Sequence, residues 1–119
     1  MQEAFRMHRD TGETSCVYLA IAPNQFLEIF PNGVQPLPKP EASAIGHSHI
    51  CYQVADVQAC NDHLIALGIP IDTPPKVGHS KCLMLWTHDP DGNPIELMQL
   101  PPESLQVQAN IRLWGTQGE

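Results

Sequence analysis

Short runs rich in apolar residues, separated by polar turn residues, occupy the chain as far as Phe30, which is typical of β-strands. These runs predict strands over residues 4–9, 13–22 and 25–30. Asp10-Thr11-Gly12 and Ala22-Pro23-Asn24 separate these strands, and both favour tight turns because Gly and Asn tolerate positive φ angles and Pro presets φ. The first part of the chain is therefore expected to consist of three short strands joined by turns.

The second part of the chain contains one stretch with a helical period. Apolar residues there recur at helical spacing: Val57, Cys60, Leu64 and Leu67. Asp56 stands where an N-cap accepts a backbone N–H, and Gly68 stands where a helix commonly ends. Strands are expected around this helix, over 47–54, 69–72, 81–87 and 94–100. A break at Pro74-Pro75 and a hairpin turn over residues 89–93 complete a β-α-β-β-β order.

A proline-rich stretch separates these two parts of the chain. Residues 31–40 read PNGVQPLPKP, and prolines at this density exclude a continuous helix or a central strand. We therefore expect one domain over 1–119, with a partial first unit (1–30), a linker (31–45), a complete βαβββ unit (46–100) and a tail (101–119). The tail carries apolar residues and is expected to pack on its own subunit or on a partner.

The two units share residues at a nearly constant spacing. Gly12, Cys16 and Leu19 recur at one common offset as Gly78, Cys82 and Leu85. Glu28 recurs as Glu96 at an offset that is larger by two positions, and we expect this difference to fall in the turn between the strands. These matches indicate an internal duplication. The counterpart of the strand and helix at 47–68 would precede residue 1, so the first unit is expected to be incomplete.

Composition excludes several classes of protein. Thirteen acidic and six basic residues give a formal charge of −7 without a Lys or Arg cluster, so we expect no nucleic-acid partner. No apolar run approaches the roughly 18–20 residues that span a bilayer, and no charged-then-apolar leader opens the chain. The four cysteines lie far apart without a CxxC pair, which favours free thiols in the cytoplasm over a zinc finger or disulfides.

Three side chains are candidates for chemistry: His49, Glu28 and Glu96. Both glutamates lie mid-strand among large apolar residues, where an unpartnered carboxylate is costly to bury. The plainer interpretation places each glutamate on a solvated face or beside a cation. Two carboxylates at equivalent positions of a repeat, with a histidine facing the same way, instead favour a divalent metal site. The strand face that carries His49 is expected to carry also His47, Cys51 and Gln53.

Two segments resemble the second module of the vicinal-oxygen-chelate superfamily. The first is residues 46–57, GHSHICYQVADV, followed by a helix that ends at Leu67-Gly68. The second is residues 86–98, WTHDPDGNPIELM, which is similar to a DPDGN-x-(I/L)-E ending. Residues 25–30, QFLEIF, are similar to the close of the first module in glyoxalase I (lactoylglutathione lyase)-like proteins. The resemblance covers about residues 3–100, and it is more specific to the superfamily than to one reaction.

The resemblance implies an α+β fold of the glyoxalase/bleomycin-resistance type, with paired βαβββ modules that form a cupped mixed sheet and a first module that is N-terminally incomplete. It also implies one divalent metal ion (Ni, Zn, Co, Mn or Fe) held by His49, Glu96 and Glu28. The fourth family ligand has no counterpart, and His47 and His8 are candidate substitutes outside the family position. The remaining histidines are expected at the surface: His63, His79 and His88.

The implied activity is that of a glyoxalase I-like lyase or isomerase. Such enzymes convert the hemithioacetal of an α-keto aldehyde and a small thiol into a 2-hydroxyacyl thioester by metal-stabilised enediolate chemistry. Glu96 and Glu28 are the expected catalytic residues: Glu96 is the expected base with Glu28 as a metal ligand or partner, and the near symmetry of the two modules leaves the reverse assignment open. The expected substrate pocket is formed by Phe26, Met84, Trp86 and Met98.

Other activities of the superfamily remain open at this point. A non-catalytic, bleomycin-resistance-like dimer that binds small molecules is the main alternative, and a related epimerase or a ring-cleaving dioxygenase are further ones. A homodimer is expected in either case, because the incomplete first unit leaves a strand edge unpaired and a sheet face without a helix.

Overall fold

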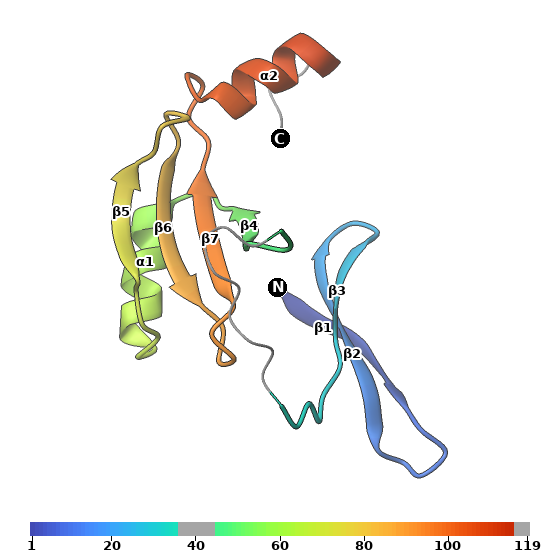
Figure 1. Cartoon of the computed structure of the whole chain (residues 1–119). Coiled ribbons are helices and arrows are strands. Elements are labelled where there is room, and N and C mark those ends of the chain that lie inside the picture. The colour runs from blue at the N-terminus through green and yellow to red at the C-terminus, as the bar shows by residue number, and fades with distance from the viewer. Residues whose placement is uncertain (36–44, 116–119) are drawn as a thin grey trace. The chain divides into compact units, whose positions relative to one another are not determined.

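The computed structural model of the chain describes residues 1–35 and 45–115, which belong to two units, Met1–Lys39 and Pro40–Glu119 (Figure 1). Most of the predicted linker, residues 36–44, and the end of the predicted tail, residues 116–119, lie outside the described residues.

The first unit is an antiparallel sheet of three strands, as predicted. These are β1 (Gln2–His8), β2 (Thr14–Ala22) and β3 (Gln25–Ile29), with β2 in the centre. Cys16 on β2 is fully buried. Three aromatic rings, Phe5, Tyr18 and Phe26, gather on one face of this sheet, one from each strand.

The second unit has the predicted β-α-β-β-β order and then one more helix. Its elements are β4 (Ile50–Gln53), α1 (Val57–Ala66), β5 (Thr73–Val77), β6 (Leu83–His88), β7 (Pro94–Gln99) and α2 (Leu105–Trp114). The four strands form one sheet in the order β4-β7-β6-β5, in which β4 and β7 run parallel and the other neighbours run antiparallel. The first strand is shorter than predicted, so His49 directly precedes it.

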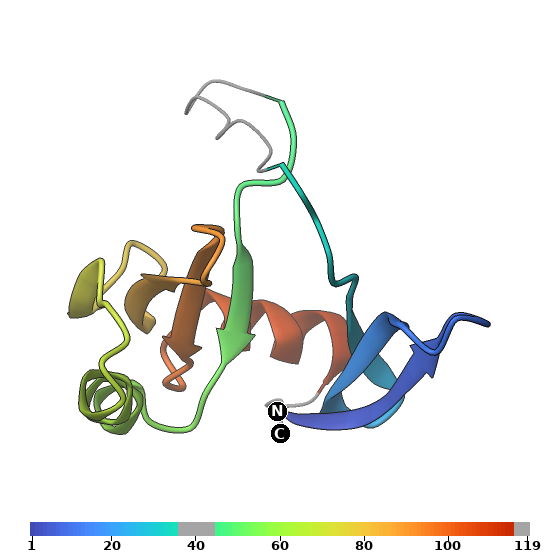
Figure 2. The same ribbon diagram turned by 90° about the horizontal axis from the view of Figure 1, so that it is seen from below.

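Helix α1 forms where its apolar spacing and caps predict. Asp56 accepts the Ala59 N–H at 2.9 Å, and Gly68 ends the helix with φ +73°, a conformation that residues with a Cβ rarely adopt. The helix lies against one face of the sheet formed by β5, β6 and β7 (Figures 1 and 2). Val57 of α1 and Leu85 of β6 are both fully buried and form the core of this unit.

The prediction for β5 was wrong. We expected a strand over 69–72 and a break at Pro74-Pro75, whereas the strand covers Thr73–Val77 and includes both prolines. Proline lacks the N–H that a central strand must donate, but β5 is an edge strand that pairs only with β6. Its register shifts between Thr73 and Lys76, and the two prolines lie at this irregularity.

Most of the tail forms helix α2, which the apolar pattern alone had not revealed. Ser104 is fully buried and caps the helix by accepting the Val107 N–H at 3.4 Å, and Gly115 ends it with φ +68°. The Leu105 N–H donates to the Ser80 carbonyl, and Gln106 donates to the Ser80 hydroxyl. These contacts fix the start of α2 to the loop before β6.

The strand registers show that the two hairpins of the internal repeat are related by one constant offset in residue number. Tyr18 pairs with Glu28 across β2 and β3, and Trp86 pairs with Glu96 across β6 and β7, so both partners are shifted by the same number of positions. The change of offset that we expected in the turn is therefore absent from these hairpins. The match of Cys16 with Cys82 does not follow this register, although both cysteines are buried.

Candidate functional site

Glu96 lies in the centre of the second sheet, on the face opposite α1. Its direct neighbours are Cys51 on β4 and Trp86 on β6, and directly paired residues of adjacent strands point to the same face. The glutamate is only 6% exposed. A carboxylate that is buried in a sheet is costly without polar neighbours, and two polar side chains lie next to Glu96 on this face.

His49 is the first of these partners. Its Nε2 lies 3.5 Å from Oε2 of Glu96, while its ring packs edge-on against Trp86 with the centroids 4.7 Å apart. Its Nδ1 lies 2.9 Å from the Ser48 hydroxyl. When Nδ1–H donates to Ser48, the Nε2 lone pair faces Glu96 and is free to bind a cation. The short distance between His49 and Glu96 agrees with the expectation that their side chains lie on the same face of the sheet.

The second partner is the Cys51 thiol, which lies directly opposite Glu96 on the neighbouring strand β4. Partial burial and the negative charge of Glu96 raise the pKa of Cys51 to about 11. The thiol is therefore neutral at pH 7, and it acts as a weak S–H donor rather than as a thiolate.

The expected pocket residues of this unit share the face of Glu96. Met84 pairs directly with Met98, and this pair lies two residues along each strand from the Trp86–Glu96 pair. The Gln106 amide of α2 lies 3.6 Å from the Met98 sulfur. This face thus combines one carboxylate and one imidazole with a wall of two methionines and an indole.

Glu28 and Phe26 belong to the first unit, where they share a face of its sheet with two residues that the sequence analysis did not single out. Tyr18 is paired with Glu28 across the strands, and the neighbouring carboxylate raises the pKa of Tyr18. The Phe5 ring stacks on Tyr18 at 4.4 Å, and Phe26 packs edge-on against both. The strand register was the signal that would have identified Tyr18.

The other histidines have separate surroundings. Nδ1 of His8 lies 3.2 Å from the Gly12 carbonyl, and Nδ1 of His88 lies 2.8 Å from the Asp72 carboxylate. His47, His63 and His79 are exposed. Within residues 1–35 and 45–115, no three His, Cys, Asp or Glu side chains gather as a group that could hold a metal ion.

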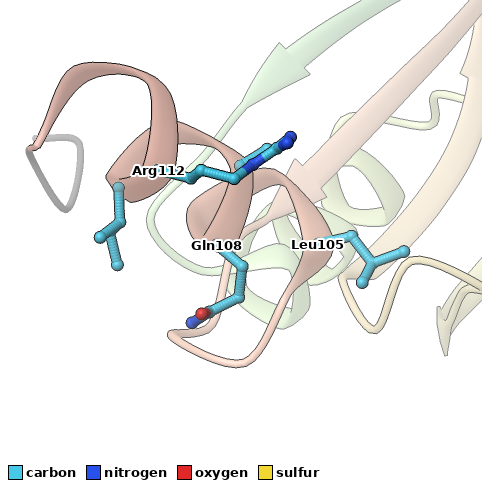
Figure 3. A pocket seen from close by; sticks show the side chains of 5 residues that line it. Leu105, Gln108 and Arg112 are labelled. Carbon is cyan, nitrogen blue, oxygen red and sulfur yellow. The ribbon is translucent and has the colours of Figure 1, made fainter.

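One pocket lies on the surface of α2, away from the predicted pocket residues. It is lined by Leu105, Gln108, Ala109, Ile111 and Arg112 (Figure 3). Its lining combines apolar side chains with one cation. Neither of the two described helices is long and apolar enough to cross a membrane.

Comparison with known proteins gives a consistent family and fold. A sequence model described as the Glyoxalase/Bleomycin resistance protein/Dioxygenase superfamily matches residues 3–97. The solved glyoxalase family protein from Enterococcus faecalis is similar at 26% identity and a TM-score of 0.65, over 82% of this chain and 76% of that chain. No curated protein was found to match the chain.

Two more distant structures share the fold. A lactoylglutathione lyase from Agrobacterium tumefaciens is 21% identical with a TM-score of 0.51, over 82% of this chain and 74% of that chain. The fosfomycin resistance protein FosX from Listeria monocytogenes is 14% identical with a TM-score of 0.54, over 86% of this chain and 74% of that chain. At these identities the likeness concerns the fold alone.

Proposed function

The chain belongs to the glyoxalase/bleomycin resistance protein/dioxygenase superfamily, and from this premise we propose that it is a divalent-metal-dependent lyase of the glyoxalase I type. Its substrate would be the hemithioacetal of an α-keto aldehyde and a small thiol, and its product a 2-hydroxyacyl thioester. The observation that carries this proposal is the pair formed by His49 and the well-buried Glu96, whose nitrogen and oxygen lie 3.5 Å apart.

The geometry of this pair fits two ligands of one metal ion. The His49 Nε2 and Glu96 Oε2 atoms lie 3.5 Å apart, so both could contact the same bound cation. Imidazole and carboxylate together suit Zn, Ni, Co, Mn or Fe. We propose His49 and Glu96 as ligands from the second unit and Glu28 as the ligand from the first.

The residues of the second sheet suit proton transfer next to such an ion. A divalent cation, when held by these residues, would supply Lewis-acid stabilisation of the negative charge that develops on the substrate. Glu96 would remove the proton from the carbon that carries sulfur and return it to the adjacent carbonyl carbon, so that substrate and product are isomers. Trp86, Met84 and Met98 would form an apolar wall that excludes water, and in the first unit Phe26 would contact the substrate.

A second candidate function is supported by the aromatic cluster of the first unit. Phe5 and Phe26 are 47% and 48% exposed, and together with Tyr18 they offer ring faces on which a small aromatic molecule can stack. In this alternative the chain would bind and sequester a small molecule without turning it over.

Metal analysis of protein purified without an affinity step tests the first proposal. Wild type should contain close to one divalent ion per chain and form thioester, Glu96→Gln should lose both, and the exposed control Glu103→Gln should keep both. Wild type that remains free of metal and inactive after reconstitution with each of the five metals would contradict the enzyme. Calorimetric binding of an aromatic ligand that is lost in Phe5→Ala and Phe26→Ala would then support the alternative.

We further propose that the chain acts as a homodimer in the cytoplasm. Support for a partner comes from large apolar side chains that are more than half exposed on α2: Leu105, Leu113 and Trp114. Support for a reducing compartment comes from the four cysteines, Cys16, Cys51, Cys60 and Cys82, all of which are free thiols.

A further inference from the structure

Helix α2 is held to the second unit only at its start. Ser104 and Val107 are buried there, and the Leu105 N–H and the Gln106 amide bind Ser80. Among the described elements of the second unit, none packs along the rest of the helix. One whole side of α2 is therefore open to a partner.

The open side of α2 carries an apolar stripe with a small residue at its midpoint. Leu105 and Leu113 stand four residues before and four residues after Ala109, so the three side chains lie on one side of the helix. Both leucines are more than half exposed, and Leu105 and Ala109 also line the pocket on this helix (Figure 3). A small residue between two leucines lets a second helix approach closely and place its own side chains on either side.

Two opposite charges stand at the two ends of this stripe. Arg112 lies in the last turn of α2 and is the only charged residue of the helix, while Glu103 is exposed just before the helix begins. In the part of the chain that the structure describes, neither side chain forms an ion pair. One cation at one end and one anion at the other make this surface complementary in charge to a copy of itself that runs in the opposite direction.

We propose that α2 packs antiparallel against α2 of a second copy of the chain, around a two-fold axis near Ala109. This inference rests on the proposed homodimer and adds how the two copies meet. Leu105 then contacts the partner's Leu113, because both stand at the same distance from the axis, and Arg112 comes close to the partner's Glu103. Both copies use the same surface, so the contact closes on itself and forms dimers rather than open chains.

Charge reversal tests this orientation, with the dimer dissociation constant measured by sedimentation equilibrium. Arg112→Glu and Glu103→Arg each bring like charges together at two places in the dimer, so each should raise the dissociation constant by about tenfold or more. The double variant restores both opposite pairs with their signs exchanged, and its dissociation constant should return to within about threefold of wild type. Lys76→Glu is the matched control, because Lys76 is exposed on the edge strand β5 and its reversal changes the net charge as Arg112→Glu does. It should leave the dissociation constant unchanged.

The double variant also separates the paired charges from the stability of α2 itself. Each reversed charge opposes the helix dipole, and the double variant carries both, so restored association cannot come from a more stable helix. Circular dichroism and denaturant unfolding of each variant show that the compared proteins are folded.

The possible outcomes distinguish this contact from the other proposals. The association measurement needs no metal and no substrate, so its result is independent of the proposed lyase activity. A monomeric wild type would contradict the homodimer itself. A wild-type dimer that neither single reversal weakens, or a double variant that associates no better than the single ones, would overturn the antiparallel contact alone. Single variants that keep the dimer but lose free energy of unfolding would show that another part of the same chain covers α2, which also overturns it.

Discussion

At the scale of single residues, the environment of Glu96 determines what Cys51 can do. The thiol lies beside a carboxylate on a partly shielded sheet face, and its pKa is raised to about 11 from the ordinary value of 9.0. Reactive cysteines need the opposite surroundings, with a positive neighbour that lowers the thiol pKa. Cys51 is therefore expected to shape the site as a small side chain with a weak donor, not as a nucleophile.

Alkylation of the metal-free protein checks this expectation. The rate of iodoacetamide modification at Cys51, followed by peptide mass spectrometry, should rise with a midpoint near pH 11. Glu96→Gln should move the midpoint to lower pH, because it removes the negative charge that opposes the thiolate. Cys60 on α1 is the internal control, and its rate of modification should be the same in both proteins at each pH. A Cys51 midpoint below pH 9 in wild type would contradict the assigned environment.

The core residue Leu85 allows a prediction about the free energy of unfolding, also at the scale of a single residue. It is fully buried between the sheet and α1, where Val57 is also fully buried. Leu85→Ala should lower the free energy of unfolding by about 2–5 kcal/mol through lost burial and a residual cavity. The exposed Ile65→Ala should change it by less than about 1 kcal/mol. Denaturant unfolding measures both, and similar losses for the two variants would contradict this core.

At the scale of elements, the hairpin between β6 and β7 depends on one side chain. Oδ1 of Asp89 accepts the Asp91 and Asn93 backbone N–H groups at 2.9 and 2.8 Å, and Oδ2 accepts the Asn93 amide at 2.8 Å. Burial alone would raise the pKa of Asp89, but these hydrogen bonds together lower it. The charged carboxylate therefore stabilises the turn.

Asp89→Ala should destabilise the protein by about 1–2 kcal/mol at pH 7. Because the folded-state pKa is lowered, this contribution is complete above the unfolded pKa of about 3.9 and is lost as the pH falls through the folded value. The difference between wild type and variant should therefore shrink below about pH 4. Asp91→Ala keeps the backbone N–H that Asp89 binds, so it should have little effect. Denaturant unfolding as a function of pH measures all three proteins.

This hairpin also shows why some elements are predictable from sequence and others are not. Asp89 to Asn93 encode their turn locally, and Asp56 with Gly68 encode the ends of α1 in the same way. β5 could not be placed, because prolines are tolerated only once the strand lies at a sheet edge, which depends on the whole topology.

In the candidate site, too, some features could be predicted from the sequence and others could not. Alternation along a strand and the family motif were enough to predict that His49 and Glu96 share a face. The pairing of Tyr18 with Glu28 depends on the register of a hairpin, which turn type and loop length set, and an irregularity between Ala20 and Ala22 shifts the register next to this turn. The cysteine spacing in the repeat gave a register that was wrong by two positions. Contacts across strands are thus the part of the site that sequence reasoning missed.

At the scale of the whole molecule, exposed apolar side chains are numerous. The described part of the chain has large apolar residues that are more than half exposed on several elements: Met1, Phe30, Val34, Ile45, Ile65, Leu67, Val77, Leu105, Leu113 and Trp114. Single exposed apolar residues are normal, but several on one helix indicate a contact surface. On α2, Leu105, Leu113 and Trp114 meet this criterion.

The proposed homodimer is expected to use α2, and one substitution there can test it. Sedimentation at micromolar concentration should give a mass of about 26 kDa, twice the chain mass of 13.1 kDa. Leu105→Glu should shift the protein to monomer by placing a charge in the apolar contact. A glutamate in the first turn of a helix also interacts favourably with the helix dipole, so α2 itself should stay folded.

Ile65→Glu provides the matched control for this experiment. Ile65 is 58% exposed on α1, and Leu105 is 56% exposed on α2, so both variants place the same charge at a similarly exposed apolar site. Only the variant on α2 should dissociate, because a general effect of added charge would act on both. A dimer that persists in Leu105→Glu would exclude α2 as the interface. A wild type that is monomeric, soluble and cooperatively folded at micromolar concentration would contradict the homodimer altogether.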